Sequence, residues 1–256
     1  MRKLLAGEPV LGAAVSVSDP TITEALADSV DFVWIDQEHN PLSMGEVQGH
    51  IMATKGSPAT PIVRVPWNDH VMIKRVLDAG AAGIIVPMVR TATEARRAVE
   101  ACLYPPAGIR GYGPRRPSNY GRRGGVDFVR SANASVIPIM QIEHVDAVEQ
   151  IDEIVAVSGI ASLVFGPNDL AGSMGLLGEP QHPKVQAAID HVIARAGAAG
   201  VFVGSGMGGT AEQIAAAFAR GMHWSLTGID YAFMLQALHQ LIGDVQQRLP
   251  RAAAAE

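Results

Sequence analysis

The stretch Phe32-Val-Trp-Ile-Asp-Gln-Glu-His39-Asn-Pro-Leu-Ser43 decides how the rest of the chain is interpreted. It opens with an uncharged apolar run, which is typical of a strand buried on both faces of a parallel sheet. Three ionisable side chains, Asp36, Glu38 and His39, follow directly, and Ser43 is a suitable N-cap for a helix. A buried strand that ends in ionisable groups is where α/β proteins usually place their chemistry. The alternative is a solvated turn before a helix.

The alternation of an apolar run with a helical pattern recurs along the whole chain. The runs, which are rich in Val and Ile, span residues 10–17, 32–35, 60–65, 83–89, 136–142, 161–165, 201–204 and 222–227. Amphipathic segments lie near residues 21–29, 43–54, 69–79, 92–103, 145–157, 183–199 and 210–220, with a last helix over about 230–248. Eight such units in 256 residues predict an α/β fold, a single (β/α)8 TIM barrel. A doubly wound open sheet is the alternative, but no Gly-x-Gly-x-x-Gly fingerprint follows the first run.

The composition predicts one globular domain over residues 1–256, with 251–256 as a frayed tail. Hydrophobic residues make up 48% and charged residues 18% of the chain, which excludes a disordered protein. The net charge of −5 argues against nucleic-acid binding. We recognise no signal peptide and no apolar run of membrane length. Because the only cysteine, Cys102, cannot form an internal disulfide, we expect a cytoplasmic protein.

Polar side chains end several of the predicted strands, and the carboxyl ends of strands meet at one face of a TIM barrel. Two of them, Glu143 and Asp169, end neighbouring strands, which lie about 4.8 Å apart, so both carboxylates can bind one ion. Two carboxylates without a nearby cysteine suit a hard divalent cation such as Mg²⁺ or Mn²⁺. The alternative is that each carboxylate pairs with an arginine. The complete set at this face is Asp36, Glu38, His39, Arg64, Gln141, Glu143, Asn168 and Asp169.

A base and a cation accompany this pair of carboxylates. His39 is the candidate general base, because histidine exchanges protons near neutral pH; a structural role is the alternative. Arg64 lies on a buried strand, where an unpaired charge is costly, so it needs an anion: either Asp36 or a carboxylate or enolate of the substrate. None of the four lysines ends a predicted strand, and Cys102 lies in a predicted helix. The sequence therefore argues against a Schiff base or a thiol nucleophile and favours chemistry through a metal.

Several short motifs together resemble the HpcH/HpaI aldolase family over about residues 4–247. They are Ile35-Asp-Gln-Glu-His39, Arg64-Val-Pro-Trp-Asn68, Leu77-Asp-Ala-Gly-Ala81, Val86-Pro-Met-Val89, Tyr104-Pro-Pro-Ala-Gly-Ile-Arg-Gly111, Gln141-Ile-Glu143 and Gly166-Pro-Asn-Asp-Leu170. This family consists of class II, metal-dependent pyruvate aldolases. The resemblance implies reversible cleavage of a 4-hydroxy-2-oxo acid to pyruvate or hydroxypyruvate and an aldehyde. It also implies Mg²⁺, Mn²⁺ or Co²⁺ as cofactor, no organic cofactor, and a homohexamer, a trimer of dimers, that exchanges its last helix between subunits.

The resemblance also implies roles for individual residues at the strand ends. By motif, His39 would be the base, and Glu143 and Asp169 would bind the metal. Gln141 and Asn168 would contact the oxo-acid, Asn168 through its backbone, and Asp169 would lie beside the same substrate.

The remaining implied roles belong to charged residues on other strands and helices. Arg64 would bind the substrate and stabilise the enolate, with Asp36 as a further catalytic residue. Asp78 would raise the basicity of His39. However, Asp78 follows the third predicted helix, at the wrong end of the barrel by simple topology. It could reach His39 only by an irregular path or from another subunit.

The chain departs from the family pattern in a few places. Gln37 stands where relatives often have a small or apolar residue. The segment 204–209 is unusually rich in glycine, which suits either tight backbone packing or a phosphate cradle. The Gly/Pro/Arg-rich stretch 104–125 is expected to be a functional loop that contacts an anion or a subunit, or else a floppy surface loop. Its arginines are Arg110, Arg115, Arg116, Arg122 and Arg123.

Two other functions stay open at this point. A lyase acting on an acyl-CoA thioester, of the citramalyl-CoA type, would share the metal and the enolate. A barrel that binds an oxo-acid without catalysis would keep Glu143 and Asp169 but would need no base.

Overall fold

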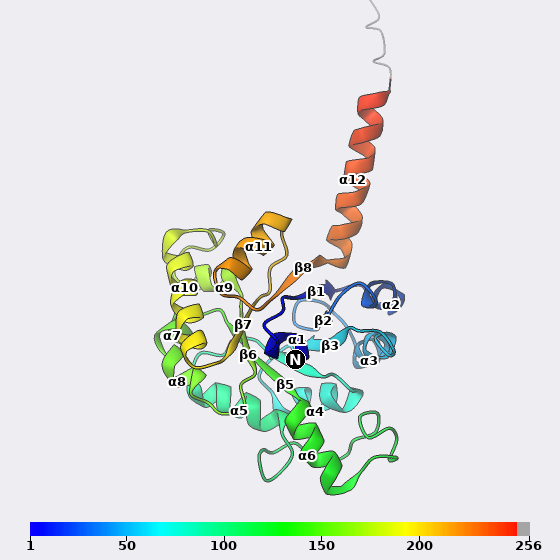
Figure 1. Cartoon of the computed structure of the whole chain (residues 1–256), viewed down its shortest axis with the longest axis vertical. Coiled ribbons are helices and arrows are strands. Elements are labelled where there is room, and N and C mark those ends of the chain that lie inside the picture. The colour runs from blue at the N-terminus through cyan, green and yellow to red at the C-terminus, as the bar shows by residue number, and fades with distance from the viewer. Residues whose placement is uncertain (250–256) are drawn as a thin grey trace, which may run out of the picture.

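The computed structural model describes residues 1–249 as a closed barrel of parallel strands with helices around it (Figure 1). The strands are β1 (Val10–Val15), β2 (Phe32–Asp36), β3 (Thr60–Arg64), β4 (Gly83–Val86), β5 (Ile137–Ile142), β6 (Ser162–Phe165), β7 (Phe202–Ser205) and β8 (Trp224–Ile229). Each strand pairs with the next, and β8 pairs with β1. The predicted TIM barrel is therefore confirmed, because the apolar runs form strands that the helices cover.

Alternation along the strands decides which side chains face the barrel interior. On β2, Phe32 and Trp34 belong to the interior cluster, whereas Val33 and Ile35 belong to the core between the strands and the helices. Asp36 follows Trp34 at the spacing of two residues that keeps it on the interior side. The same rule applies to three other polar residues at strand ends, Arg64 on β3 and Gln141 and Glu143 at the end of β5.

The helices follow the predicted segments, with three additions. They are α1 (Arg2–Leu5), α2 (Thr21–Ala27), α3 (Met44–Ala53), α4 (His70–Ala79), α5 (Ala92–Cys102), α6 (Gly125–Ser135), α7 (Val145–Glu149), α8 (Ile151–Val155), α9 (Pro167–Ser173), α10 (Pro183–Ala198), α11 (Ala211–Ala219) and α12 (Asp230–Arg248). Helices α1, α6 and α9 were not predicted, and the segment 145–157 forms two helices instead of one. Ser43 caps α3 as expected, in a capping box with Glu46. Among residues 1–249, none of the helices has both the length and the hydropathy that crossing a bilayer requires.

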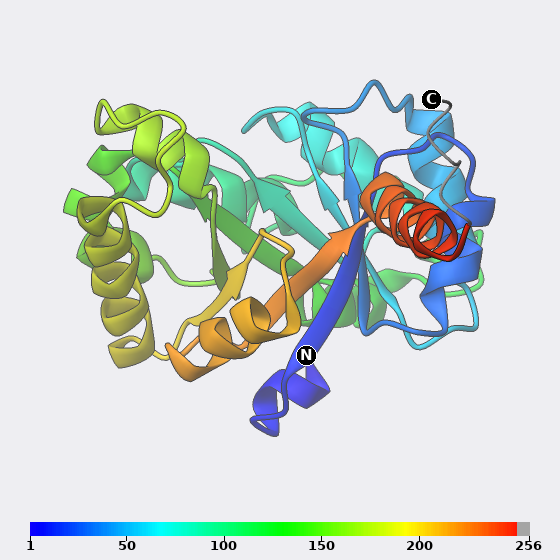
Figure 2. The ribbon, with the colours of Figure 1, turned by 90° about the horizontal axis from the view of Figure 1, so that it is seen from above.

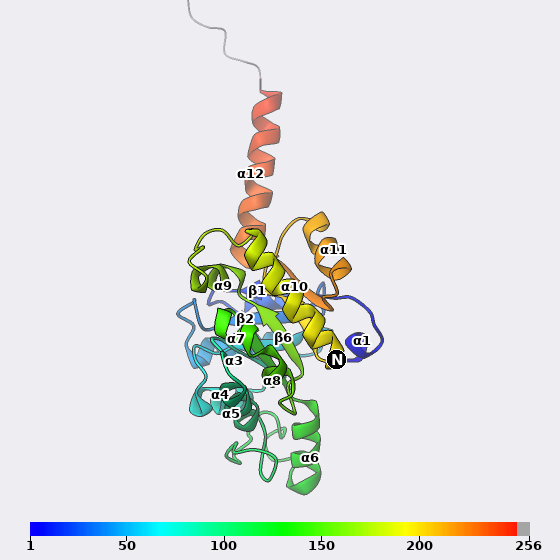
Figure 3. The same cartoon turned by 90° about the vertical axis from the view of Figure 1, so that its left-hand side faces the viewer.

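The last helix, α12, extends away from the barrel (Figures 1 and 3). Its first residue, Asp230, is buried and accepts hydrogen bonds from the backbone N–H groups of Ser16 and Val17 at 2.7 and 3.0 Å. This anchors the start of α12 to the end of β1. Several large apolar side chains further along are exposed, namely Met234, Leu235, Leu238, Leu241, Ile242 and Val245. Exchange of α12 between subunits stays a prediction, and the predicted tail 251–256 lies outside the described residues.

Candidate active site

A cavity of about 680 Å³ opens at the carboxyl ends of the strands. The strand ends form one wall of this cavity. The segment between β7 and α11 and the first turns of α12 form the other wall. Glu143 lies beside the cavity, because the Gln141 side-chain amide donates a hydrogen bond to Glu143 Oε2. The structure thus brings together seven of the eight residues to which the resemblance gives a role, and only Asp78 lies elsewhere. The six that line the cavity are Asp36, His39, Arg64, Gln141, Asn168 and Asp169.

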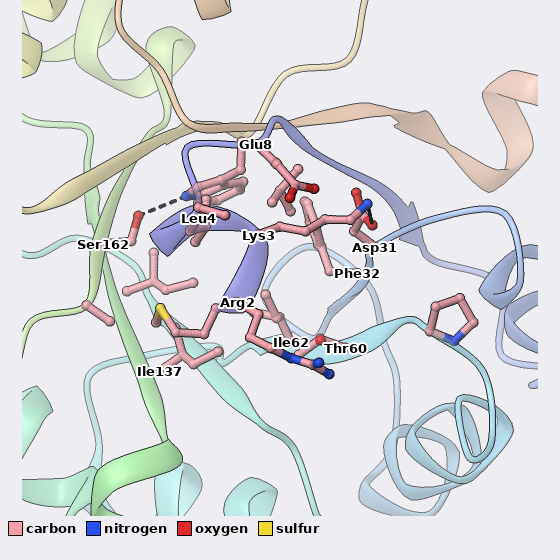
Figure 4. Close-up of a pocket in the computed structure, with 17 residues that line it drawn as sticks. Arg2, Lys3, Leu4, Glu8, Asp31, Phe32, Thr60, Ile62, Ile137 and Ser162 are labelled. Carbon is pink, nitrogen blue, oxygen red and sulfur yellow. Dashed lines mark hydrogen bonds and ion pairs between the residues drawn. The ribbon is translucent and has the colours of Figure 1, made fainter.

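A second cavity, of about 770 Å³, lies beneath α1 at the amino ends of the strands (Figure 4). Figure 2 shows α1 at one end of β1 and α12 near the other end. Two pairs of polar groups in this cavity bind each other: Lys3 with Asp31, and Trp224 Nε1 with Ser162 Oγ at 2.8 Å. None of the predicted site residues lines it. Since active sites of TIM barrels lie at the carboxyl ends of the strands, we assign the candidate site to the first cavity.

Arg64 is held by two carboxylates. Asp36 and Arg64 face each other in the register of β2 and β3. Arg64 Nε and Nη2 donate to the two oxygens of Asp36, each at 2.8 Å, and Nη1 lies 2.9 Å from Glu38 Oε2. The guanidinium also stacks over Trp34, 5.2 Å from the ring centroid. Burial alone would lower the pKa of Arg64, but the hydrogen bond and the neighbouring charges raise it, so the side chain is a fixed cation.

Asp36 organises the loop that carries the candidate base. Besides the two bonds from Arg64, it accepts hydrogen bonds from the Glu38 backbone N–H at 3.1 Å and from Asn40 Nδ2 at 2.8 Å. Its lone pairs are therefore committed, and the anion that Arg64 required is Asp36. The arrangement favours a positioning role for Asp36, because it fixes the turn on which His39 stands.

Glu143 is a buried carboxylate, and both of its oxygens accept hydrogen bonds. Its Oε1 accepts a hydrogen bond from the Met88 backbone N–H, and its Oε2 accepts one from Gln141. A side chain at Gly166 would overlap Oε2, so glycine leaves room for this position of the carboxylate where the turn after β6 passes it. Burial raises the pKa of Glu143 to about 7, although both hydrogen bonds oppose the shift.

Asp169 is exposed to the cavity from the first turn of α9. Its charge is close enough to Glu143 to raise the pKa of that residue further. Within residues 1–249, neither carboxylate forms an ion pair with a lysine or an arginine, and no cluster of three or more possible ligands is present. The pair fits a hard divalent cation, because a buried carboxylate near a second one and without a cation of its own is the environment that such an ion would neutralise.

Glu38 is a residue that the sequence placed at this face of the barrel without giving it a role. It lies between two site residues: Oε2 is 2.9 Å from Arg64 Nη1 and 3.7 Å from His39 Nε2. Burial raises the pKa of Glu38 to about 7, the charge of Arg64 opposes this, and Asp36 and Asp169 add to it. Asp36 and Glu38 therefore share the guanidinium of Arg64 at this face of the barrel. The position of Glu38 next to the two ionisable groups was the available signal.

Comparison with known proteins identifies the family of the chain. The model of the HpcH/HpaI aldolase/citrate lyase family matches residues 15–237. The chain belongs to this family. A 4-hydroxy-2-oxo-heptane-1,7-dioate aldolase of Salmonella dublin is 42% identical over 200 residues, which are 77% of this chain and 75% of the relative.

Two solved structures with similar barrels carry different names. A family protein from Burkholderia cenocepacia is 33% identical, with a TM-score of 0.90 over 96% of this chain and 98% of its own. A citrate synthase is 29% identical, with a TM-score of 0.87 over 96% of this chain and 97% of its own. Family membership supports an enzyme of the aldolase or lyase type. Because similar barrels carry different names, it does not identify the substrates. The substrates must be inferred from the residues of this chain.

Asp78 lies apart from the other site residues of this HpcH/HpaI family member. It stands near the end of α4, the helix that runs from the carboxyl end of β3 to the amino end of β4. Arg110 Nη2 donates to it at 2.7 Å, and this buried arginine also stacks over Tyr104. Within one chain, Asp78 therefore does not act on His39. A role through another subunit stays a prediction.

The structure accounts for glycines in segment 204–209 and places the arginine-rich stretch 104–125 away from the cavity. In the glycine-rich segment, a side chain at Gly204 would overlap Trp224, and one at Gly208 would come within 2.6 Å of the Gly228 backbone. Tight packing therefore accounts for these glycines. The arginine-rich stretch packs against the end of α4 through Arg110, and none of its arginines lines the cavity.

Proposed function

We propose that the protein is a class II aldolase that depends on a divalent metal. It would reversibly cleave 4-hydroxy-2-oxo acids to pyruvate or hydroxypyruvate and an aldehyde. The observation that carries this proposal is the pair of carboxylates, Glu143 and Asp169, which stand without a protein cation beside a cavity that also holds a fixed arginine and a histidine. Membership of the aldolase/citrate lyase family supports the same reaction type.

Glu143 and Asp169 are the residues that would hold the metal, which we expect to be Mg²⁺, Mn²⁺ or Co²⁺. When bound, the ion would supply positive charge for the keto oxygen and carboxylate of the substrate. The chain provides the rest of the binding site for the oxo-acid. Gln141 and the backbone at Asn168 would contact it, a role supported by the position of both residues in the lining of the cavity.

Cleavage then requires a base and a stabilised enolate. His39 would take the proton of the C4 hydroxyl, so that the C4–O bond becomes a carbonyl and the aldehyde leaves. The electron pair of the C3–C4 bond passes to C3 as an enolate. Arg64 would stabilise the developing negative charge, and its fixed geometry makes it suited to this, because Asp36 and Glu38 prevent it from reorienting. Protonation at C3 completes the formation of pyruvate.

The metal assignment is tested with Glu143→Ala. We expect pyruvate release from a 4-hydroxy-2-oxo acid to fall by at least about a hundredfold with saturating Mg²⁺ or Mn²⁺, while the exposed control Glu24→Ala keeps its rate. Titration calorimetry with Mn²⁺ alone should show weaker binding in the same variant. Full cleavage by Glu143→Ala would refute the assignment.

The base is tested separately. In deuterated water, the unmodified enzyme should exchange the methyl protons of pyruvate, and His39→Ala should exchange them at least about tenfold more slowly. Unchanged exchange in His39→Ala would show that another group is the base.

We also propose that the enzyme is a homohexamer. The exposed apolar side chains on α12 support an assembly in which this helix is covered by another copy of the chain. Leu238→Glu should lower the mass measured by light scattering, whereas the exposed polar control Gln247→Glu should not. An unchanged mass would refute the involvement of α12.

A further inference from the structure

The backbone at Met88 has a conformation that residues other than glycine rarely adopt. Its φ angle is 56°, in the left-handed region, where the Cβ atom crowds the neighbouring carbonyl group. Within residues 1–249, the other non-glycine residues with a positive φ are Asn119 and Tyr120, and both are exposed in the arginine-rich stretch. Met88 instead follows β4 and is half-buried beside the site. Strain of this kind clusters at functional sites, where the surrounding structure enforces it.

Two buried valines enforce the turn at Met88. Val86, the last residue of β4, and Val89 are both 0% exposed, and both belong to the core between the strands and the helices. Side chains alternate along a strand, so an extended chain would direct residue 89 to the face opposite that of residue 86. The chain must therefore turn between the two valines, and the left-handed conformation of Met88 provides this turn.

Pro87 helps to decide where the Met88 N–H group points. The ladder between β4 and β5 ends with Val86 opposite Met140. Pro87 has no N–H group with which to extend this ladder. The next donor along the chain is the N–H group of Met88, and it binds Glu143 Oε1. The turn therefore directs a backbone donor at the buried carboxylate of the candidate site.

The bond from Met88 complements the one from Gln141. Gln141 donates to Glu143 Oε2, so each carboxylate oxygen has one fixed donor. A backbone N–H group cannot rotate away as a side chain can, so the φ angle of Met88 sets the direction of the bond to Oε1. Each carboxylate oxygen has a second lone pair, which is left for a cation. The orientation of the carboxylate thus depends on a strained backbone conformation.

We propose that Met88 is a positioning residue for the metal site: its left-handed backbone holds the Glu143 carboxylate in the orientation that receives a divalent cation. The inference rests on the proposed aldolase function, because it takes Glu143 as a metal ligand. The backbone conformation carries this role, and the side chain of Met88 does not. Residues that tolerate a positive φ should therefore replace Met88, whereas residues branched at Cβ should not.

Two isomeric side chains test the inference. Met88→Leu and Met88→Ile introduce groups of the same composition, but isoleucine is branched at Cβ and disfavours the left-handed region. By titration calorimetry, Mn²⁺ should bind Met88→Leu within about twofold of the unmodified protein and Met88→Ile at least about tenfold more weakly. Met88→Gly, which takes a positive φ without strain, should also stay within about twofold. Equal affinities of the leucine and isoleucine variants would overturn the inference.

Unfolding in urea separates positioning from a purely structural role. If Met88 only shapes the turn, Met88→Ile should lose unfolding free energy while its Mn²⁺ affinity stays equal to that of Met88→Leu. Positioning of Glu143 instead predicts that the affinity falls in protein whose circular dichroism shows it to be fully folded. The first result refutes the proposal and the second supports it.

A spectroscopic measurement covers the case in which Met88→Ile does not fold. In protein labelled with heavy nitrogen at methionine, the amide signal of Met88 is the one that Met88→Leu removes. Saturating Mg²⁺ should shift this signal, because a cation on the carboxylate changes the hydrogen bond that the amide donates. The amide of Met52, an exposed residue of α3, is the control and should not shift. A Met88 signal that does not respond to Mg²⁺ would overturn the inference.

These outcomes also separate the inference from the proposed function. If the unmodified protein binds no Mn²⁺ and Glu143→Ala keeps full cleavage, the metal assignment fails and this inference fails with it. If Glu143→Ala loses both cleavage and Mn²⁺ affinity while Met88→Ile keeps them, only the inference fails.

Discussion

Replacing Asp36 with asparagine tests the view that a buried ion pair organises the site. Asp36 accepts two hydrogen bonds from Arg64 at 2.8 Å, one from Asn40 at 2.8 Å and one from the Glu38 backbone at 3.1 Å. Its side chain is 6% exposed, and that of Arg64 is 14% exposed. Asparagine keeps one acceptor oxygen but turns an N–H₂ group toward donors. The guanidinium, which is largely buried, then loses its main counter-charge.

The expected cost follows from this burial. Removing one partner of a buried ion pair costs about 3–5 kcal/mol of unfolding free energy, because the other charge is left uncompensated. Glu38, 2.9 Å from Arg64 Nη1, retains part of the compensation. We therefore expect the lower part of that range, about 3 kcal/mol, for Asp36→Asn. The control Asp152→Asn removes an exposed ion pair in the same way. The side chains of Asp152 and its partner Arg195 are 57% and 47% exposed, so the loss of unfolding free energy should stay below about 1 kcal/mol.

Urea unfolding followed by far-UV circular dichroism measures both values. All variants should be compared at one protein concentration, because an oligomer gains stability with concentration. The m-values should agree among the proteins if the change concerns stability alone. A loss in Asp36→Asn no larger than that in Asp152→Asn would refute the reasoning. The variant should also slow proton exchange of pyruvate by at least about tenfold, since Arg64 and His39 lose their fixed geometry.

Three further predictions concern other parts of the molecule. Burial raises the pKa of Cys102 to about 12. Ellman's reagent should therefore leave the native protein unmodified near pH 8 and label one thiol per chain in guanidinium. Rapid labelling of the native protein would contradict the burial of Cys102. In Gly166→Ala, the new methyl group displaces the Glu143 carboxylate, so Mn²⁺ should bind at least about tenfold more weakly by calorimetry while circular dichroism stays unchanged; equal affinity would refute the contact. Burial lowers the pKa of His50 from 6.5, so protonation favours the unfolded chain. The unfolding free energy should therefore fall as the pH decreases below 6.5. This fall should be smaller in His50→Gln, and an equal fall in the variant would assign the pH dependence to other groups.

The barrel was predictable because its strands are buried on both faces. Such strands must be continuous apolar runs, and these are visible in the sequence without any knowledge of tertiary contacts. Helix starts were equally local, as the capping box at Ser43 shows. Helix α6 was missed because it begins at Gly125, the last residue of the Gly/Pro/Arg-rich stretch that was interpreted as a loop. Helix α9 has only 7 residues and begins at Pro167, which is too short for a helical period to be recognised.

The candidate site was predictable as a set of residues but not as a set of contacts. Topology alone brings the carboxyl ends of neighbouring strands together, which is why Glu143 and Asp169 could be paired from the sequence. The partner of Arg64 could not be decided, because it depends on the register between β2 and β3 that places Asp36 opposite it. The pairing of Asp78 with Arg110 depends on how the irregular loop after α5 returns to α4, which no periodic pattern encodes.

The two proposed metal ligands differ in a way that suits the capture of a hydrated ion. Glu143 is 2% exposed and fixed by Met88 and Gln141, so its geometry is set before any ion arrives. Asp169 is exposed on the first turn of α9 and lines the open cavity. A hard cation sheds its water stepwise, so an accessible carboxylate can meet it first while the buried one defines its final position. The rigid ligand stands at the end of a barrel strand and the accessible one on a turn, and this division lets one site combine entry with precise placement.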